Sequence, residues 1–330
     1  MEKIRIGVVG AGWFGNEHVD RLIKRDDVKV VAVVNGGEEA LRNIGRKVPE
    51  AGLYRSYEEM VAERDDLDAL VVCVQPHRHG NIEQDAAKRG LHLFVEKPLG
   101  LSLEKAKENL AIIEASGIVC AVDYQERYAE GIAESRAALA GKPIGAISGW
   151  WIDHMPAAPW WRDKEKSGGQ IVEQSTHIID LLRYFAGEAE EVYAFSGNSY
   201  VFEDPTVKTD SASLSTIKFK NGTVGSLTSG CYLSEAQSSE IGIHISAKDL
   251  SVSFVQNDKV ICEAAGTAKE FPIKLSTHDS AMNTFIEAVK TKDTSSIRSD
   301  YRDALETFKL TLALELSIKE HRPVALAELA

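Results

Sequence analysis

The chain has 330 residues, 44% of them hydrophobic, and a formal net charge of −12. Its length favours two domains that each bury a core of their own. The excess of acidic side chains leaves no basic surface for a nucleic acid or an anionic membrane, so neither class of partner is expected.

The cysteines and the first residues indicate the compartment. Cys73, Cys120, Cys231 and Cys262 are far apart and form no C-x-x-C pair, which favours free thiols over a disulfide framework or a zinc site. Residues 1–10 already read as a strand that leads into a turn, without the pattern of a secretory signal. We therefore expect a cytoplasmic protein.

Short β-branched runs alternate with charged helical segments in the first part of the chain. This alternation predicts an α/β domain over residues 1–122, with a doubly wound parallel sheet whose strands are covered on both faces. The expected strands are Ile4–Val9, Val28–Val34, Ala69–Val74, Leu91–Val95 and Ile118–Val122, and Leu103–Ala115 has helical spacing.

A glycine-rich turn follows the first expected strand. Gly10, Gly12 and Gly15, with Trp13 and Phe14 between them, match the G-x-G-x-x-G fingerprint of dinucleotide-binding Rossmann domains. A strand precedes the turn and a helical segment follows it, as the fingerprint requires. The sequence thus predicts NAD or NADP as cofactor, with the pyrophosphate at the helix N-terminus.

The residue after the second expected strand leaves the choice of cofactor open. Many NAD-specific enzymes have an acidic residue there, but this chain has Asn35. Arg42 or Arg46 could reach a 2′-phosphate, whereas Glu38 and Glu39 at the start of the next helix would repel one.

A second motif, Glu96-Lys97-Pro98, closes the strand that ends at Val95. The carboxyl ends of parallel strands border the crevice in which doubly wound sheets bind ligands. Lys97 is therefore expected beside the cofactor, where its charge could stabilise a developing alkoxide.

The second part of the chain has a different pattern. Strand-like segments follow one another there without long helices between them, which predicts an α+β domain over residues 123–330 with an open, mainly antiparallel sheet. The expected strands are Ala146–Ile152, Glu191–Phe202, Ala212–Phe219, Thr223–Leu233, Ile241–Phe254 and Val260–Ala264, with helices at Gln174–Phe185, Asp279–Val289 and Asp300–Glu320. We expect the helix at about 300–320 to pack on the first domain and the open face of the sheet to form a homodimer or homotetramer.

Three motifs in order resemble those of the Gfo/Idh/MocA oxidoreductase family: the glycine turn, residues 95–100, and the segment from Gly168 to Asp180. The resemblance covers the whole chain and implies that Glu173 is an acid, that His177 is the catalytic base and that Asp180 is an ordering carboxylate. Many relatives have Asp at the position of Glu173. Spacing alone places Glu173 and His177 on one face of a helix.

The resemblance also implies a cofactor contact at the turn from Gln75 to His79. Pro76 and His79 match the family's Pro-x-x-His pattern, and Glu96 lies in the matching lysine motif. The Arg127-Tyr128 pair resembles a structural pair at the domain junction. No histidine spacing indicates a metal site.

Four of the five tryptophans lie just before the Glu173 segment, at positions 150, 151, 160 and 161. Aromatic faces beside polar groups suit a sugar or polyol, so we expect Trp160, Trp161 and Arg162 to contact the substrate. Packing at an interface is the alternative for the tryptophans, and a solvated loop is the alternative for Arg162, Lys164 and Lys166.

The leading hypothesis is an NAD(P)-dependent oxidoreductase acting on a secondary alcohol or carbonyl of a sugar, polyol or related compound. Two alternatives remain open. One is an NAD-dependent glycosidase that oxidises a ring hydroxyl transiently and then eliminates the aglycone, for which Glu173, Asp153 or His154 would be the second base. The other is a non-catalytic regulatory protein that binds the cofactor on the same fold.

Overall fold

The computed structural model describes residues 3–199 and 202–329. Within it the chain divides into two compact units, residues 1–123 with 281–302 and residues 124–280 with 303–330. The end of the expected strand Glu191–Phe202 includes residues 200–201, which lie outside the described residues. No helix in the described ranges is both long and apolar enough to cross a bilayer.

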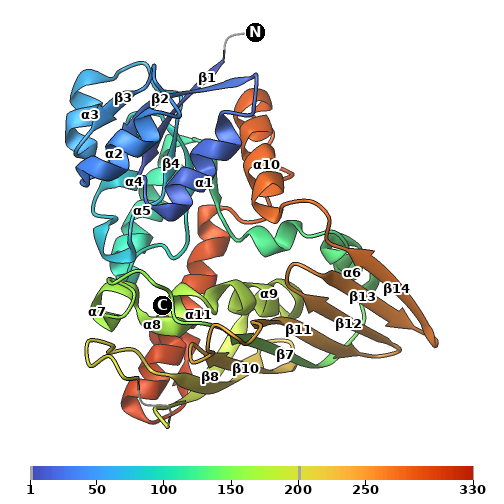
Figure 1. The fold of residues 1–330 in the computed structure, drawn as a ribbon. Coiled ribbons are helices and arrows are strands. Elements are labelled where there is room, and N and C mark those ends of the chain that lie inside the picture. The colour runs from blue at the N-terminus through green and yellow to red at the C-terminus, as the bar shows by residue number, and fades with distance from the viewer. Residues whose placement is uncertain (1–2, 200–201, 330) are drawn as a thin grey trace. The chain divides into compact units, whose positions relative to one another are not determined.

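The first unit holds a six-stranded parallel sheet of order β3-β2-β1-β4-β5-β6 (Figure 1). This confirms the predicted doubly wound sheet and adds β3, which is too short to leave a clear pattern. Its elements are β1 (Ile4–Val9), α1 (Trp13–Leu22), β2 (Val28–Val34), α2 (Glu38–Gly45), β3 (Gly52–Tyr54), α3 (Tyr57–Glu63), β4 (Ala69–Val72), η1 (Pro76–Arg78), α4 (Ile82–Lys88), β5 (His92–Val95), α5 (Leu103–Ser116) and β6 (Cys120–Val122).

The second unit holds a nine-stranded sheet of order β14-β13-β12-β11-β7-β10-β9-β8-β15. Among the strands described, β7 and β10 run parallel and the other neighbours antiparallel, which confirms the mainly antiparallel sheet. The strands are β7 (Ile144–Ile152), β8 (Ala189–Gly197), β9 (Ala212–Phe219), β10 (Val224–Gly230), β11 (Glu240–Ala247), β12 (Leu250–Val255), β13 (Lys259–Ala264), β14 (Thr267–Pro272) and β15 (Val324–Ala325).

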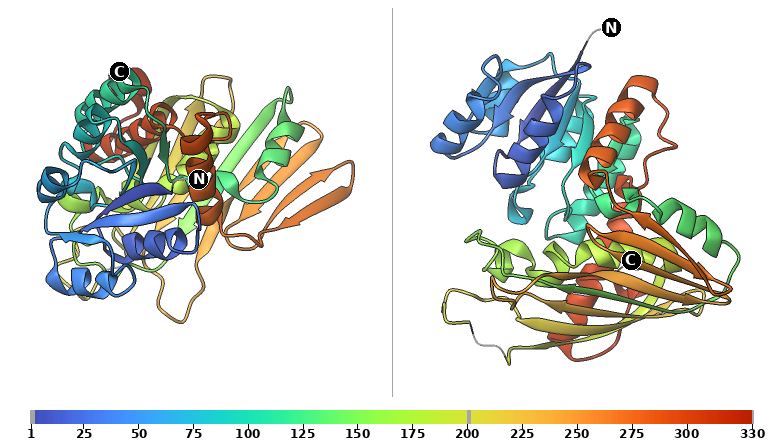
Figure 2. Two further views of the ribbon diagram at one scale, coloured as in Figure 1. Left: turned by 90° about the horizontal axis from the view of Figure 1, so that it is seen from above. Right: turned by 45° about the vertical axis from the view of Figure 1, so that its right-hand side comes forward.

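Helices and short turns complete the chain. They are η2 (Gln125–Tyr128), α6 (Ile132–Leu139), α7 (Lys164–Ser167), α8 (Gly169–Glu173), α9 (Thr176–Ala186), α10 (Thr277–Thr291), α11 (Tyr301–Glu320) and η3 (Leu326–Leu329). The right-hand view of Figure 2 shows this sheet nearly edge-on, with α9 along one of its faces. Ile178 and Leu182 of α9 are fully buried and join the core with Ile147 of β7.

The single strand expected over Ile241–Phe254 is in fact a hairpin of β11 and β12. Asp249 has a φ of 60° at the turn between them, and Ala247 pairs with Leu250. Alternating side chains continue on both sides of this turn, so the sequence pattern concealed it.

The packing of the last long helix, α11, on the first domain stays a prediction. Most of α11 belongs to the second unit, because Leu310, Ala313 and Leu314 join that unit's core. The segment that returns to the first unit is 281–302, where Phe285 packs against Phe94 with ring centroids 5.5 Å apart.

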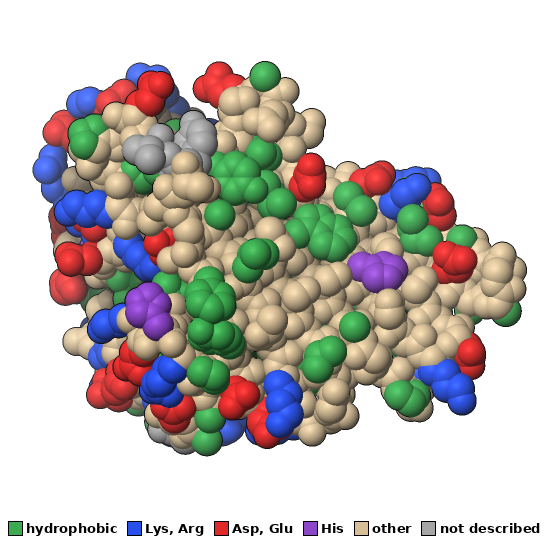
Figure 3. Space-filling view, turned by 90° about the horizontal axis from the view of Figure 1, so that it is seen from below, with side chains coloured by type: hydrophobic (Ala, Val, Ile, Leu, Met, Phe, Trp, Pro, Cys, Tyr) green, Lys and Arg blue, Asp and Glu red, His purple; other side chains and the backbone are tan. Residues whose placement is uncertain are grey.

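Within the described ranges, no helix covers the other face of the nine-stranded sheet. In β9 the buried side chains alternate with exposed ones, and Leu214 on this face is 62% exposed. Figure 3 shows the face as mostly uncharged, with scattered hydrophobic side chains in the middle and acidic and basic ones toward its rim. Phe195, Val224 and Val255 are further large hydrophobic residues with more than a third of their surface exposed.

Candidate active site

The glycine turn between β1 and α1 has the geometry that a dinucleotide needs. Gly10 has a φ of 98°, and a Cβ on it would lie 2.4 Å from the carbonyl oxygen of Cys73. A Cβ on Gly15 would lie 1.9 Å from the carbonyl oxygen of Gly10, whereas one on Gly12 would meet nothing within 4 Å. The turn is therefore closed toward the sheet and open at Gly12, where a pyrophosphate can approach the backbone. Beside it, Phe14 is partly buried and Trp13 is 77% exposed.

Asn35 follows β2 and stabilises the same turn. Its backbone N–H donates to Tyr54 O at 3.0 Å, and its side-chain amide donates to Ala11 O at 3.4 Å. Glu38 nearby pairs with Arg42 and with Arg55, each at 3.2 Å. Sequence reasoning missed Arg55, because it follows β3, a strand that the pattern did not reveal.

Lys97 follows β5 and is partly buried, and its peptide bond to Pro98 is cis. Glu96 before it is buried and accepts a hydrogen bond of 2.7 Å from Nε2 of His18 on α1. This pair joins the helix after the glycine turn to the strand that carries Lys97. Sequence reasoning also missed His18, which is 78 residues from its partner.

His18, Cys73 and Glu96 form a group of possible metal donors, in which His18 and Glu96 are buried and Cys73 is partly buried. One donor atom from each lies within 4.8 Å of the other two. Two donors on one zinc ion are about 3.3 Å apart when each bond is about 2.0 Å. The 2.7 Å between His18 and Glu96 is shorter, so a direct hydrogen bond fits these two atoms better than a shared ion.

The turn from Gln75 to His79 lies at the end of β4. Pro76 is buried, and a Cβ on Gly100 would lie 3.6 Å from Pro76 O, so this turn adjoins the loop after Lys97. His79 is 4% exposed, and its Nδ1 bonds to Glu83. Gln75 is partly buried, and His77 and Arg78 are exposed.

Glu173 and His177 do not share one continuous helix, contrary to the prediction from their spacing. α8 ends at Glu173 and α9 begins at Thr176. The backbone N–H of Ser175 donates five residues back to Gln170 O, at 2.9 Å. A hydrogen bond between the buried hydroxyls of Ser175 and Ser229 ties this break to β10.

Two aromatic residues and a hydroxyl surround His177 at the start of α9. The Trp151 ring stacks on the imidazole with centroids 5.5 Å apart, and the Tyr124 ring meets it edge-on at 6.1 Å. The Tyr124 hydroxyl bonds to Thr176 Oγ1 at 2.9 Å. His177 is 6% exposed, so its ring is largely shielded from solvent.

Trp161 is buried rather than open to a sugar. It is 1% exposed, and its indole N–H donates to Glu173 Oε2 at 2.8 Å. Trp160 beside it is partly exposed. The indole thus fixes one oxygen of the Glu173 carboxylate, a role that the sequence pattern did not suggest.

Asp180 belongs to a buried ion-pair network. Arg127 donates to it through Nε and Nη2, both at 2.6 Å, and Thr307 Oγ1 donates to its Oδ1 at 2.8 Å. Arg127 pairs in addition with Asp303, which is also the partner of Arg183. The network joins η2, α9 and α11, which fits an ordering role for Asp180.

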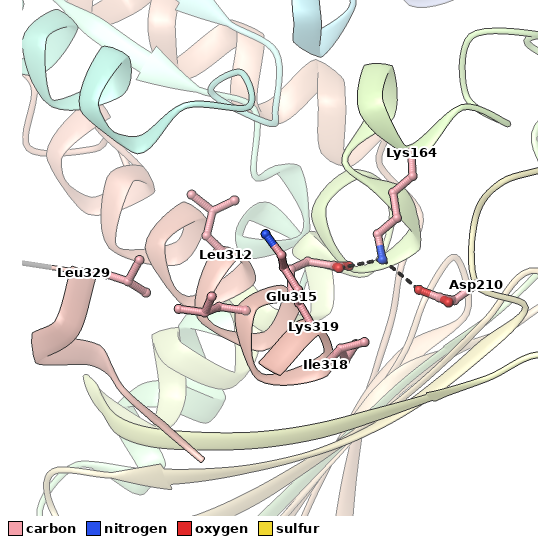
Figure 4. Close-up of a pocket in the computed structure, with 8 residues that line it drawn as sticks. Lys164, Asp210, Leu312, Glu315, Ile318, Lys319 and Leu329 are labelled. Carbon is pink, nitrogen blue, oxygen red and sulfur yellow. Dashed lines mark hydrogen bonds and ion pairs between the residues drawn. The ribbon is translucent and has the colours of Figure 1, made fainter. Parts of the chain in front are cut away.

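The basic residues of the segment after Trp161 have acidic partners. Arg162 pairs with Asp204, and Lys164 Nζ lies 2.7 Å from both Asp210 Oδ2 and Glu315 Oε2. Figure 4 shows Lys164 between the two carboxylates, beside a cavity of about 540 Å³. The cavity is lined by Lys164, Asp210, Leu312, Glu315, Leu316, Ile318, Lys319 and Leu329.

Asp153 and His154 at the end of β7 hold the loop between β10 and β11. His154 Nδ1 bonds to Asp153 Oδ1 at 3.0 Å, and its Nε2 bonds to Ser234 O at 2.9 Å. Ser239 also donates to Asp153 Oδ1. The Asp153 carboxylate raises the pKa of His154 above its ordinary value.

Two family models match the chain. One, for an oxidoreductase family with an NAD-binding Rossmann fold, covers residues 4–124, and one for the GFO/IDH/MocA C-terminal domain covers residues 138–251. The chain is 28% identical to myo-inositol 2-dehydrogenase of Thermotoga maritima over 225 residues, which are 67% of each protein. It is 29% identical to scyllo-inositol 2-dehydrogenase (NAD(+)) of Bacillus subtilis over 234 residues, 68% of this chain and 66% of that one.

A solved structure has the same fold over nearly the whole chain. Levoglucosan dehydrogenase in complex with NADH superposes with a TM-score of 0.86 at 19% sequence identity, covering 98% of this chain and 99% of that one. The sequence matches, by contrast, span about two thirds of the length of the two inositol dehydrogenases.

Proposed function

Because the chain belongs to the GFO/IDH/MocA oxidoreductase family, we propose that it is an NAD(P)-dependent dehydrogenase of a sugar or polyol. The glycine turn carries this proposal, since it is closed at Gly10 and Gly15 and open at Gly12, as a bound pyrophosphate requires. The bound nicotinamide supplies the hydride acceptor or donor.

Two side chains act on the reacting alcohol. Lys97 stabilises the alkoxide by charge and hydrogen bonding, and His177 takes the hydroxyl proton as the carbon loses hydride. In the reverse direction His177 returns that proton. The stacking of Trp151 on His177 supports this role, because it fixes the plane of the imidazole.

Glu173 is proposed to bind a substrate hydroxyl or to orient His177. The Trp161 indole holds Oε2 of its carboxylate, and a fixed acceptor discriminates among hydroxyl positions better than a mobile one. The named activities of the inositol dehydrogenases favour a polyol or sugar as substrate.

A substrate screen tests the proposal. The purified protein is mixed with inositols, aldoses, anhydrosugars and glycosides, with NAD and with NADP, and the absorbance of the reduced nicotinamide is followed. We expect reduction in step with substrate consumption for at least one polyol or sugar. Sugar release from a glycoside with flat absorbance would instead establish the glycosidase, and binding of cofactor without turnover of any compound would favour the regulatory protein.

A further inference from the structure

Two buried carboxylates lie at the carboxyl edge of the six-stranded sheet. Glu96 directly follows β5 and Asp123 directly follows β6, and they are 6% and 0% exposed. His18 of α1, which is fully buried, contacts both, with Nε2 2.7 Å from Glu96 Oε1 and 3.9 Å from Asp123 Oδ2. We call His18, Glu96 and Asp123 the acidic cluster.

The acidic cluster combines two carboxyl groups with one imidazole, so acidic groups outnumber basic ones in it. At the end of β4, burial first, and then the charges of Glu96 and Asp123 against the opposing charge of Arg21, raise the pKa of the Cys73 thiol well above its ordinary value. Low-dielectric surroundings make the field of such charges strong.

The strand order indicates which half of the dinucleotide this field meets. A dinucleotide lies across the carboxyl edge of such a sheet, at the switch between β1 and β4. The pyrophosphate turn follows β1, and Asn35, at the ribose position of the adenosine half, follows β2. The nicotinamide half therefore extends toward β4, β5 and β6, where the acidic cluster lies.

The charge of nicotinamide changes during the reaction. The oxidised ring carries a positive charge, and the reduced ring is neutral. From these observations we infer that the acidic cluster makes the protein bind the oxidised dinucleotide more tightly, relative to the reduced one, than it would without Glu96 and Asp123. This inference rests on the proposed dehydrogenase function and adds to it a preference for one redox state of the cofactor.

The test measures the dissociation constants of the oxidised and reduced cofactor for the parent and for Glu96→Gln. The amide keeps the shape and an acceptor for His18 but removes the charge. We expect the affinity for the oxidised form to fall about tenfold relative to that for the reduced form. Asp123→Asn should shift the ratio in the same direction, which covers the case in which Glu96→Gln does not fold.

The matched control is Asp68→Asn. Asp68 precedes β4, so it lies at the opposite edge of the same sheet, and its replacement also removes one negative charge. In Asp68→Asn, the ratio of the dissociation constants of the oxidised and reduced cofactor should stay within about twofold of the parent's ratio. Equal weakening of both cofactor forms in Glu96→Gln would overturn the inference, because it would show a ribose contact without a charge effect. The inference would also be overturned if the ratio of the two dissociation constants stayed unchanged in both Glu96→Gln and Asp123→Asn. A parent that binds neither form would refute the proposed function itself.

Discussion

At the scale of single residues, the hydrogen bond from Trp161 to Glu173 changes the role expected for a tryptophan. A buried indole that donates to a carboxylate fixes the direction of that carboxylate. We therefore propose that Trp161 positions Glu173 and that the substrate contacts of this segment fall on Trp160 and Glu173.

Trp161→Phe should keep the packed ring but remove the donor. We expect kcat to fall about tenfold or more, because a hydrogen bond to a charged group contributes about 1.5–3 kcal/mol. Dinucleotide affinity and the unfolding midpoint should change little. The control is Trp150→Phe, because Trp150 of β7 has no proposed substrate contact. In the background of Glu173→Gln, the Trp161 replacement should have no further effect on kcat. Equal losses in both backgrounds would show that Trp161 acts through packing alone.

Lys97→Met tests the charge at the reacting oxygen. We expect turnover to fall about 100-fold to 1,000-fold, which corresponds to about 3–4 kcal/mol of transition-state stabilisation, while NAD affinity stays nearly unchanged. Steady-state rates and a separate cofactor titration measure the two effects. Lys88→Met, at an exposed position of α4, is the control. Activity within a few-fold of the parent would remove Lys97 from the mechanism.

At the scale of elements, two glycines in the turn from β1 to α1 should have different roles: Gly15 affects the stability of the fold, and Gly12 affects dinucleotide binding. Gly15→Ala forces a methyl group to within 1.9 Å of Gly10 O, so we expect it to cost about 3 kcal/mol of unfolding free energy. Gly12→Ala meets no atom within 4 Å and should leave the unfolding free energy unchanged. It should nevertheless weaken dinucleotide binding, because the methyl group occupies the approach of the pyrophosphate. Denaturant unfolding and cofactor titration of both variants test this prediction. A similar loss of unfolding free energy in Gly12→Ala and Gly15→Ala would contradict it.

The loop between β10 and β11 should respond to pH through His154. Its pKa is raised from the ordinary 6.5 by hydrogen bonding to Asp153, so the protonated ring stabilises the folded loop fully below about pH 6.5. That contribution is lost as the pH rises through the raised folded-state pKa.

Hydrogen exchange of residues 231–239 measures this effect, after correction for the intrinsic rates. We expect protection to decrease between pH 6 and pH 9 in the parent and to be low and constant in His154→Gln. The turn at Asn221–Gly222 serves as an internal control, because the Asn221 side chain bonds to Ala186 and Thr223. A decrease of the same size in His154→Gln would assign the pH response to another group.

At the scale of the whole molecule, the open face of the nine-stranded sheet is the surface on which we expect self-association. Exposed apolar side chains in the middle of an uncharged face favour a symmetric contact with a second copy. Leu214→Glu would place a charge at that position, and we expect it to shift the protein from dimer or tetramer to a smaller species in light scattering after gel filtration. The control is Leu275→Glu, since Leu275 is 66% exposed outside the sheet. A parent that is monomeric, or an equal effect of both variants, would contradict the prediction.

The sequence by itself determined the two sheets and the glycine turn. β-branched runs between helical segments specify parallel strands, and Gly10, Gly12 and Gly15 specify a turn, because each depends on residues that are neighbours in the chain. The same local reasoning failed where a short element or a tight break interrupts a pattern, as at β3 and between Glu173 and Thr176.

Only the tertiary structure decided how the site residues are held. His18 meets Glu96 across 78 residues, and Trp161 meets Glu173 from a separate segment. The end of α8 at Glu173 depends on Ser175 and Ser229, which are 54 residues apart. Such pairs form where distant segments pack together, and a periodic pattern records which side of an element is buried but not which partner it meets there.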